Sequence, residues 1–230
     1  MLLLGHRGCR GEFTENTFAA FDHAVASGCD GFELDVRLTS DMVPVIWHDA
    51  RLRGHFISRQ TFASLRDRCL MTRRLPRRPV IELCQLEEVL ARYSHVAWMD
   101  IELKVRGLEA QVASLVKHYS PTRGFVISSF QRPVLLALHR IDPSLPLAFI
   151  FDRMPRAKVL STLPIEYVKP SARLVTAARV AQLHAGGMKV LTWTVNHPSA
   201  MRRLSEAGVD GMIGDDPVLL ESGRRIMIGG

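Results

Sequence analysis

Residues 96–130, VAWMDIELKVRGLEAQVASLVKHYSPTRGFVISSF, read as a strand, a helix and a second strand. We expect the strands at 96–105 and 124–130, with the helix at 107–120 between them. Strands that alternate with helices pair in parallel and are joined by right-handed crossovers. This stretch therefore predicts one unit of a parallel α/β sheet.

The same alternation continues in both directions along the chain. Before this stretch we expect a strand at 2–5, a helix at 16–28, strands at 31–38 and 43–49, and a helix at 84–94. After it we expect, in order, helix 132–142, strands 145–151 and 165–171, helix 173–187, strand 189–196, helix 198–208 and strand 209–215.

Strands 31–38 and 43–49 interrupt this order because only residues 39–42 separate them. A parallel crossover needs a dozen residues or more, so these two strands are predicted to form an antiparallel hairpin. With the second hairpin strand set aside, eight strand–helix units remain, which is the number in a TIM (β/α)8 barrel. No break in composition marks a linker. The sequence therefore predicts a single α/β barrel domain over residues 1–230, with an antiparallel hairpin after its second strand.

The composition limits which binding partners and which cellular compartment we expect for this protein. The net charge is +7, and 25 of the 30 basic residues are arginine, yet no segment interleaves basic and aromatic residues as a nucleic-acid site would. No apolar run is long enough to span a membrane. The four cysteines form neither a CxxC motif nor a zinc-like cluster, so we expect free thiols and a cytoplasmic location. The stretch TRRLPRRP (72–79) is expected to be a loop.

Acidic residues alternate with apolar ones on two of the expected strands. Glu33 and Asp35 share one side of their strand, and Glu102 and Lys104 share one side of theirs. The apolar neighbours take the other side, where barrel helices pack, so the charged residues face the interior. Bare carboxylates are costly there. Three of them predict a hard divalent cation with oxygen ligands; the structural alternative is an ion-pair cluster.

Two histidines are predicted to reach the same cavity. If the hairpin turns on residues 40–41, His48 lies opposite Glu33; if it turns on residues 41–42, His48 lies opposite Asp35. His6 arrives from the end of the first strand, and this arrangement suits a general acid and a general base. Arg7 is interpreted as a bidentate donor to a phosphate oxygen, beside glycines that let the backbone approach a ligand.

The motifs resemble those of the glycerophosphodiester phosphodiesterases, which are TIM barrels. The resemblance extends over nearly the whole chain. Its motifs are GHRG (5–8), ENT (15–17), ELDV (33–36), PVIWHD (44–49), IELK (101–104), ISSF (127–130), TWTVN (192–196) and GVDGMIGDDP (208–217).

The resemblance implies a role for each candidate residue. It implies His6 and His48 as the catalytic pair, with Glu33, Asp35 and Glu102 as ligands of Mg²⁺, Ca²⁺ or Mn²⁺. It further implies that Arg7 and Lys104 hold the phosphate and that Trp193 lines the side taken by the alcohol; otherwise the indole fills the core.

The chain departs from this family pattern at two points, and Asp100 is one further inward acid. Met42 stands where the turn usually has glycine, and the stretch after His48 (50–62) is short, which predicts an open pocket. Asp100 also alternates inward, either as support for Glu102 or as a buried structural acid.

The predicted function is metal-dependent hydrolysis of a glycerophosphodiester to glycerol 3-phosphate and an alcohol. The nucleophile is either water or the glycerol 2-hydroxyl, and either histidine can be the acid. The substrate is expected to be a small molecule. The alternatives are a lysophospholipase D or sphingomyelinase D-like lipid phosphodiesterase and a catalytically silent phosphodiester-binding barrel. A sugar-phosphate isomerase lacks support, because no strong phosphate-binding glycine loop follows the later strands.

Overall fold

The computed structural model describes residues 1–71 and 82–228. The basic stretch 72–79 therefore lies outside the described residues, and the loop predicted there stays a prediction. Eight parallel strands form a closed ring, because β1 pairs with both β11 and β2. Around the ring they are β1 (Leu2–Gly5), β11 (Gly211–Gly214), β10 (Lys189–Trp193), β9 (Tyr167–Pro170), β8 (Leu147–Phe151), β7 (Phe125–Ser129), β6 (Trp98–Leu103) and β2 (Gly31–Leu38). The predicted TIM barrel is confirmed.

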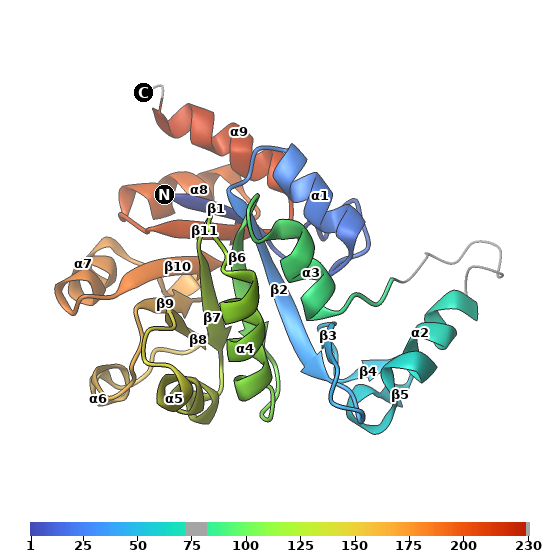
Figure 1. Ribbon diagram of the computed structural model, residues 1–230. Coiled ribbons are helices and arrows are strands. Elements are labelled where there is room, and N and C mark those ends of the chain that lie inside the picture. The colour runs from blue at the N-terminus through green and yellow to red at the C-terminus, as the bar shows by residue number, and fades with distance from the viewer. Residues whose placement is uncertain (72–81, 229–230) are drawn as a thin grey trace.

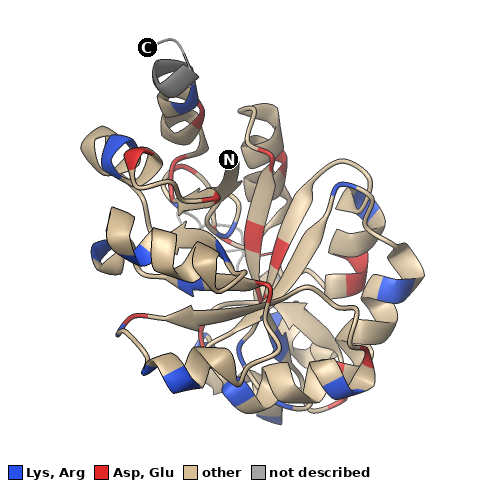
Figure 2. Ribbon diagram, turned by 90° about the vertical axis from the view of Figure 1, so that its left-hand side faces the viewer, with Lys and Arg blue, Asp and Glu red and all other residues tan. Residues whose placement is uncertain are grey.

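Helices surround this ring, as Figure 1 shows. They are α1 (Phe18–Ala26), α3 (Leu86–Tyr93), α4 (Glu109–Tyr119), α5 (Arg132–Ile141), α6 (Ala157–Ser161), α7 (Ala177–Ala185), α8 (Pro198–Glu206) and α9 (Pro217–Ile228), whereas α2 (Phe62–Met71) lies to one side of the barrel. Lysines and arginines are spread over several of the outer helices (Figure 2). None of the described helices is long and apolar enough to cross a membrane.

Side-chain caps explain where two helices begin. The hydroxyl of Thr17 accepts a hydrogen bond from the backbone N–H of Ala20, so α1 begins at Phe18 rather than at the predicted residue 16. The Thr176 hydroxyl likewise accepts from Arg179 and starts α7. The helix predicted at 173–187 is therefore shorter, and residues Ala172–Leu174 form a separate 3₁₀ turn (η3).

The barrel interior changes character along its axis. One half is apolar and is filled by a cluster of buried residues on six strands, namely Leu4, Trp98, Val126, Ala148, Leu191 and Ile213. The side chains that come next on β6, β7 and β9 are Asp100, Ser128 and Lys169, and all three are buried. On the outside of the ring, the alternate residues pack beneath the helices in one larger core that includes Phe32, Leu34 and Ile101. The predicted assignment of faces on β2 and β6 is confirmed.

The hairpin after the second strand is present, but its register differs from both predictions. β3 (Pro44–Ile46) pairs antiparallel with β2 so that Val36 faces Ile46 and Leu38 faces Pro44. The loop therefore has three residues, and its last, Met42, has a φ of 62°. A residue in this left-handed conformation closes a common three-residue hairpin loop. β3 ends before His48, so the predicted pairing of His48 with Glu33 or Asp35 was wrong.

A small unit follows His48. It consists of the two-stranded hairpin β4 (Arg51–Leu52) and β5 (His55–Phe56), the 3₁₀ turn η1 (Ile57–Arg59) and α2. Leu52, Ile57 and Leu65 pack with Val45 in a separate apolar cluster. In Figure 1 this unit lies to one side of the barrel, next to β3.

Candidate active site

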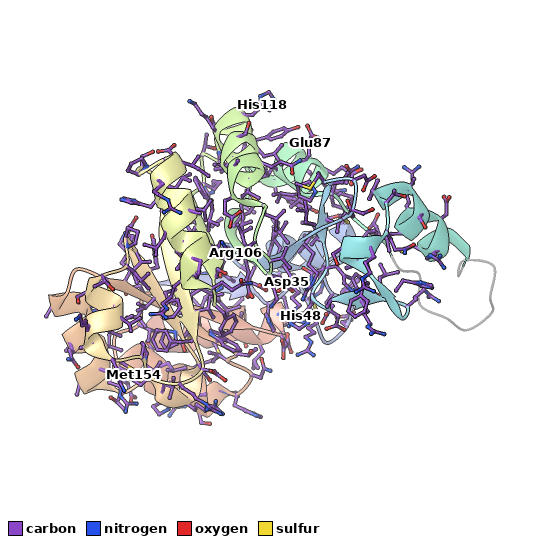
Figure 3. The ribbon with its side chains drawn as sticks, turned by 90° about the horizontal axis from the view of Figure 1, so that it is seen from below. Asp35, His48, Glu87, Arg106, His118 and Met154 are labelled. Carbon is purple, nitrogen blue, oxygen red and sulfur yellow. The ribbon has the colours of Figure 1, made fainter. Side chains whose placement is uncertain are left out.

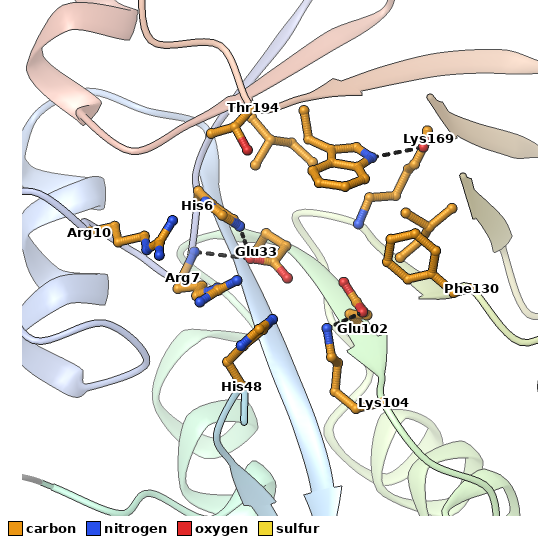
Figure 4. Close-up of a pocket in the computed structure, with 13 residues that line it drawn as sticks. His6, Arg7, Arg10, Glu33, His48, Glu102, Lys104, Phe130, Lys169 and Thr194 are labelled. Carbon is orange, nitrogen blue, oxygen red and sulfur yellow. Dashed lines mark hydrogen bonds and ion pairs between the residues drawn. The ribbon is translucent and has the colours of Figure 1, made fainter. Parts of the chain in front are cut away.

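The predicted site residues other than Asp35 line one pocket at the carboxyl-terminal ends of the strands (Figure 4). In TIM barrels this end carries the active site. The pocket is lined by His6, Arg7, Arg10, Glu33, His48, Glu102, Lys104, Phe130, Ile150, Lys169, Trp193, Thr194 and Ile213. Asp35 lies just behind this wall, paired with Arg7 and Lys104.

Three buried carboxylates meet at the base of this pocket. Parallel pairing of β2 with β6 sets Asp35 beside Glu102, with Glu33 two residues earlier on β2. One oxygen from each of the three lies within 4.8 Å of the others. The side chains are at most 9% exposed. Buried carboxylate oxygens that converge in this way fit a hard divalent cation, so the donor set suits the predicted metal.

The three carboxylates differ in how their charge is balanced. Lys104 Nζ lies 2.6 Å from Glu102 Oε1 and 3.3 Å from Asp35 Oδ1, and Arg7 Nε lies 3.1 Å from Asp35 Oδ2. The Asn16 side-chain amide donates a hydrogen bond of 2.9 Å to Asp35. Burial alone would raise the pKa of Asp35, but Lys104, Arg7 and Asn16 together hold it below its usual value.

Glu33 has the opposite balance. It accepts a 3.0 Å hydrogen bond from the Arg7 backbone N–H, but within the described residues neither lysine nor arginine pairs with it. Burial, and then the negative charge of Asp35, hold the pKa of Glu33 well above its usual value. A bound cation would relieve this excess of negative charge, which is a second reason why the site fits a metal.

His6 is held by the last strand of the barrel. Its Nδ1 lies 2.6 Å from Asp215 Oδ1, and the Asn196 amide donates a hydrogen bond of 2.5 Å to the other oxygen of Asp215. Burial would raise the pKa of Asp215, but the contact with His6 lowers it overall. With Nδ1 engaged, Nε2 points to the pocket and lies 3.9 Å from Glu33 Oε2. His6 therefore presents one ring nitrogen to a ligand.

His48 reaches the same pocket by a different route from the one predicted. It follows β3, and its carbonyl accepts a hydrogen bond of 2.7 Å from Arg37 Nε. Its Nδ1 lies 2.8 Å from Asp49 Oδ1, and the side chain is 34% exposed. In the view from below, His48 lies next to Asp35 (Figure 3). The two histidines thus share the pocket although the predicted register was wrong.

Arg7 is a buried residue that contacts two acids. Its Nη1 lies 2.7 Å from Glu15 Oε1, while its Nε faces Asp35. Burial would lower the pKa of the guanidinium, but Asp35, Glu33 and Glu15 raise it, so the charge is retained. The glycines beside it serve packing within the protein. A Cβ on Gly5 would lie 1.9 Å from the Gly8 carbonyl oxygen, so internal packing already requires glycine here, and its role in ligand approach stays a prediction.

Two aromatic rings form the opposite wall. The Trp193 indole N–H donates a hydrogen bond of 2.9 Å to the Lys169 carbonyl, and its ring meets Phe130 edge-on at 5.7 Å between centroids. Phe130 is 43% exposed. Lys104 Nζ lies 5.9 Å from the centroid of the Phe130 ring. Trp193 therefore borders the pocket, in a position open to a substrate.

Several contributors were not predicted from the sequence. Asp215, Asn16 and Glu15 belong to quoted motifs but received no role. Lys169 was not predicted to be a site residue, although its ammonium pairs with Asp100 and donates a hydrogen bond of 3.1 Å to Ser128. Burial would lower the pKa of Lys169, but Asp100, Glu33 and Glu102 raise it, so the ammonium keeps its proton. Asp100 thus has a lysine partner at the floor of the pocket.

A second groove lies elsewhere on the barrel surface. It runs between the segment after β8 and helix α7 and is lined mainly by apolar side chains such as Leu160, Leu163 and Met188. Met154, at its edge, is far from Asp35 and His48 in Figure 3. Its lining contains no acid or histidine, so it lacks the chemistry of the first pocket.

Comparisons with known proteins identify the family. A glycerophosphodiester phosphodiesterase of Bacillus altitudinis is 29% identical over 231 residues, which cover 94% of each chain. A lysophospholipase D of Rattus norvegicus is 26% identical over 270 residues, covering 95% of this chain and 84% of its own. The fold is similar to an Oleispira antarctica phosphodiesterase solved with its product sn-glycerol 3-phosphate, with a TM-score of 0.82, 23% identity, and coverage of 98% and 97%. Residues 6–219 match the sequence model of the Glycerophosphoryl diester phosphodiesterase family, and the chain belongs to this family.

Proposed function

We propose that this phosphodiester hydrolase converts glycerophosphodiesters to sn-glycerol 3-phosphate and an alcohol in the pocket at the carboxyl-terminal ends of its strands. The observation that carries the proposal is the convergence of His6 and His48 on a buried trio of carboxylates. The product named for the Oleispira antarctica structure and the activity named for the Bacillus altitudinis relative support the same substrate class.

Glu33, Asp35 and Glu102 hold a divalent cation, with Mg²⁺, Ca²⁺ and Mn²⁺ as the candidates for an all-oxygen site. When bound, the cation supplies positive charge that stabilises the phosphoryl oxygens as negative charge develops on them. Arg7 and Lys104 already lie beside Asp35 and extend this positive charge toward the substrate. Their donors orient the phosphate, and those of Arg7 come from a planar, rigid guanidinium.

The two histidines divide the proton transfers. One accepts the proton of the nucleophile, which is either water or the glycerol 2-hydroxyl, as its oxygen bonds to phosphorus. The other gives a proton to the alcohol oxygen as its bond to phosphorus breaks. Asp215 orients His6 for this work, and Asp49 contacts the corresponding nitrogen of His48. Trp193 and Phe130 border the side of the pocket that takes the alcohol.

A lysophospholipase D activity is the second candidate, since a family relative carries that name and Phe130 leaves an apolar surface at the pocket. A sphingomyelinase D-like enzyme is less well supported, because all four cysteines are free and loop disulfides are expected in that class. These free thiols also support a reducing compartment such as the cytoplasm. A silent phosphodiester-binding barrel is disfavoured by the complete set of two histidines and three carboxylates.

One panel of assays tests the function. Glycerophosphodiesters and lysophospholipids are incubated with Mg²⁺, Ca²⁺, Mn²⁺ or chelator, and the released alcohol is measured. We expect turnover of glycerophosphodiesters only with a divalent cation, and its loss in Glu102→Gln. The control variant Glu206→Gln changes an exposed glutamate on α8 and should behave as wild type. Turnover of lysophospholipids alone would favour the second candidate, and no turnover would favour the silent barrel.

A further inference from the structure

The floor of the pocket holds a lysine side chain, Lys169, whose ammonium group has no part in the proposed chemistry. Lys169 is 2% exposed, and its side chain comes up from β9 between the aromatic wall and the carboxylate trio (Figure 4). Its Nζ is paired with Asp100 and donates to the Ser128 hydroxyl, which in turn donates a hydrogen bond of 2.6 Å to Asp100. Asp100 on β6 and Ser128 on β7 thus hold the ammonium of Lys169 in place from the adjoining side of the barrel.

The fixed ammonium has a donor to spare. An ammonium carries three N–H groups. Asp100 and Ser128 are the two partners found for Lys169 within the described part of the chain. Because Lys169 lines the pocket, the third N–H is available to a ligand there. A buried donor costs free energy when it stays unpaired, so a ligand that supplies an oxygen gains from meeting it.

The surroundings of Lys169 indicate which ligand atom it meets. Asp100 already balances its charge, so the pair offers a strong hydrogen-bond donor with little net charge. Arg7 and Lys104 carry the positive charge on the other side of the trio, next to Asp35. A phosphate group is better served there, whereas a neutral hydroxyl suits the donor at Lys169. The Lys169 carbonyl also accepts from Trp193, so the same residue positions the neighbouring aromatic wall.

We propose that Lys169 is a specificity-determining residue whose third N–H donates to a hydroxyl of the glycerol moiety, and that Asp100 and Ser128 position it. This proposal rests on the proposed function, because it assigns a partner for the glycerol part of that substrate. It gives the enzyme a means to prefer glycerol phosphates over other phosphate esters of the same charge.

The test compares the binding of two ligands, both with Mg²⁺ present. Glycerol 3-phosphate and ethyl phosphate carry the same phosphate, but ethyl phosphate lacks the hydroxyls. Calorimetry should show that wild type binds glycerol 3-phosphate more tightly, and Lys169→Met should reduce this preference by about 10- to 100-fold. In Lys169→Met with Asp100→Asn, binding of ethyl phosphate should stay within about twofold of wild type, because the Lys169–Asp100 pair carries little net charge and contributes little to phosphate binding.

Two double variants separate the donor from the charge. Lys169→Met with Asp100→Asn, and Lys169→Gln with Asp100→Asn, both leave an uncharged floor, but only glutamine keeps N–H donors. We expect the glutamine version to retain more of the preference than the methionine version. Lys189→Met is the matched control, because Lys189 pairs with Glu166 at the opposite end of the strands, 2.8 Å away, and should change neither affinity.

The outcomes distinguish this proposal from the proposed function. If wild type binds neither ligand, the proposed function itself fails. If wild type binds both and Lys169→Met with Asp100→Asn weakens both equally, Lys169 acts on the phosphate and the proposal is overturned. A preference that survives in Lys169→Met overturns it as well.

Discussion

Asp100 and the trio Glu33, Asp35 and Glu102 face the interior of the same barrel, and their charges are balanced differently. Asp100 has a buried lysine and a serine hydroxyl as partners. Glu33, directly beside Asp100 in the register of β2 and β6, has mainly other acids around it. The comparison teaches that buried carboxylates alone do not mark a metal site; a deficit of positive charge among them does. The predictions below test this difference, from the largest expected effect to the smallest.

Removing the cation should abolish catalysis that depends on the trio Glu33, Asp35 and Glu102. Chelation, or Glu102→Gln, should lower turnover by more than about 10³-fold, because the charge that stabilises the phosphoryl oxygens is lost. Initial rates before and after restoring Mg²⁺ measure the effect. Full turnover in chelated enzyme would show that the trio is an ion-pair cluster without a metal.

The histidines above the trio should act as one unit. His6→Ala and His48→Ala are each expected to lower kcat by roughly 10²–10⁴-fold, and the double variant should be little worse than the poorer single one. A nitrophenyl diester needs no protonation of its leaving group, so the histidine that acts as general acid should matter much less for it. Equal impairment of both variants on both substrates would exclude this division of roles.

Breaking the ion pair between Lys169 and Asp100 should lower the unfolding free energy and leave metal binding unchanged. Lys169→Met leaves Asp100 as a buried charge without its partner, which costs about 3–5 kcal/mol of unfolding free energy. Lys169→Met with Asp100→Asn should recover much of this loss. Denaturant unfolding of the chelated variants measures both values, and a single variant as stable as wild type would show that the pair is not needed for folding.

Glu33, the acid that lacks a lysine or arginine partner, should make the metal-free protein less stable as pH rises. Folding raises the pKa of Glu33, so the folded protein binds this proton more tightly than the unfolded chain does. The unfolding free energy of the metal-free protein should therefore fall as pH rises from the unfolded value, about 4.3, through the raised folded value. Glu33→Gln should remove this fall. Unfolding free energies measured between pH 4 and pH 8 test this prediction. Parallel pH profiles for wild type and Glu33→Gln would contradict it.

Arg7→Lys should have the smallest effect. Lysine keeps the charge beside Asp35 but loses the planar fork, so we expect kcat/KM to fall by about tenfold with little change in unfolding free energy. An unchanged kcat/KM would limit Arg7 to its ion pairs with Asp35 and Glu15. Steady-state kinetics on one glycerophosphodiester are sufficient to decide.

The alternation of residues and of elements along the sequence was sufficient to predict the inward acids and the barrel. It was not sufficient where the conformation of one residue decides the structure. The inward acids followed from the period of two along β2 and β6, and the barrel followed from the order of strands and helices. The position of His48 could not be predicted, because Met42 adopts a left-handed conformation and adds a third loop residue. Helix α6 was missed because it has only five residues.

Lys169 was missed for a different reason. One lysine in a four-residue strand looks like an ordinary solvent-facing position. Its meaning depends on Asp100, 69 positions earlier in the sequence, and that pairing exists only once the barrel has closed.

The contact between His6 and Asp215 joins residues 209 positions apart, at the seam where β1 meets β11. A ribosome synthesises the histidine 209 residues before the aspartate. While the chain is being made, both histidines and all three inward carboxylates can be present before the final strand is in place. Until that strand docks and the His6 backbone N–H reaches the Gly214 carbonyl, the imidazole has no partner to orient it. Alignment of the catalytic groups is thus tied to the synthesis and docking of β11, and a chain truncated before β11 would carry the reactive groups without the means to align them.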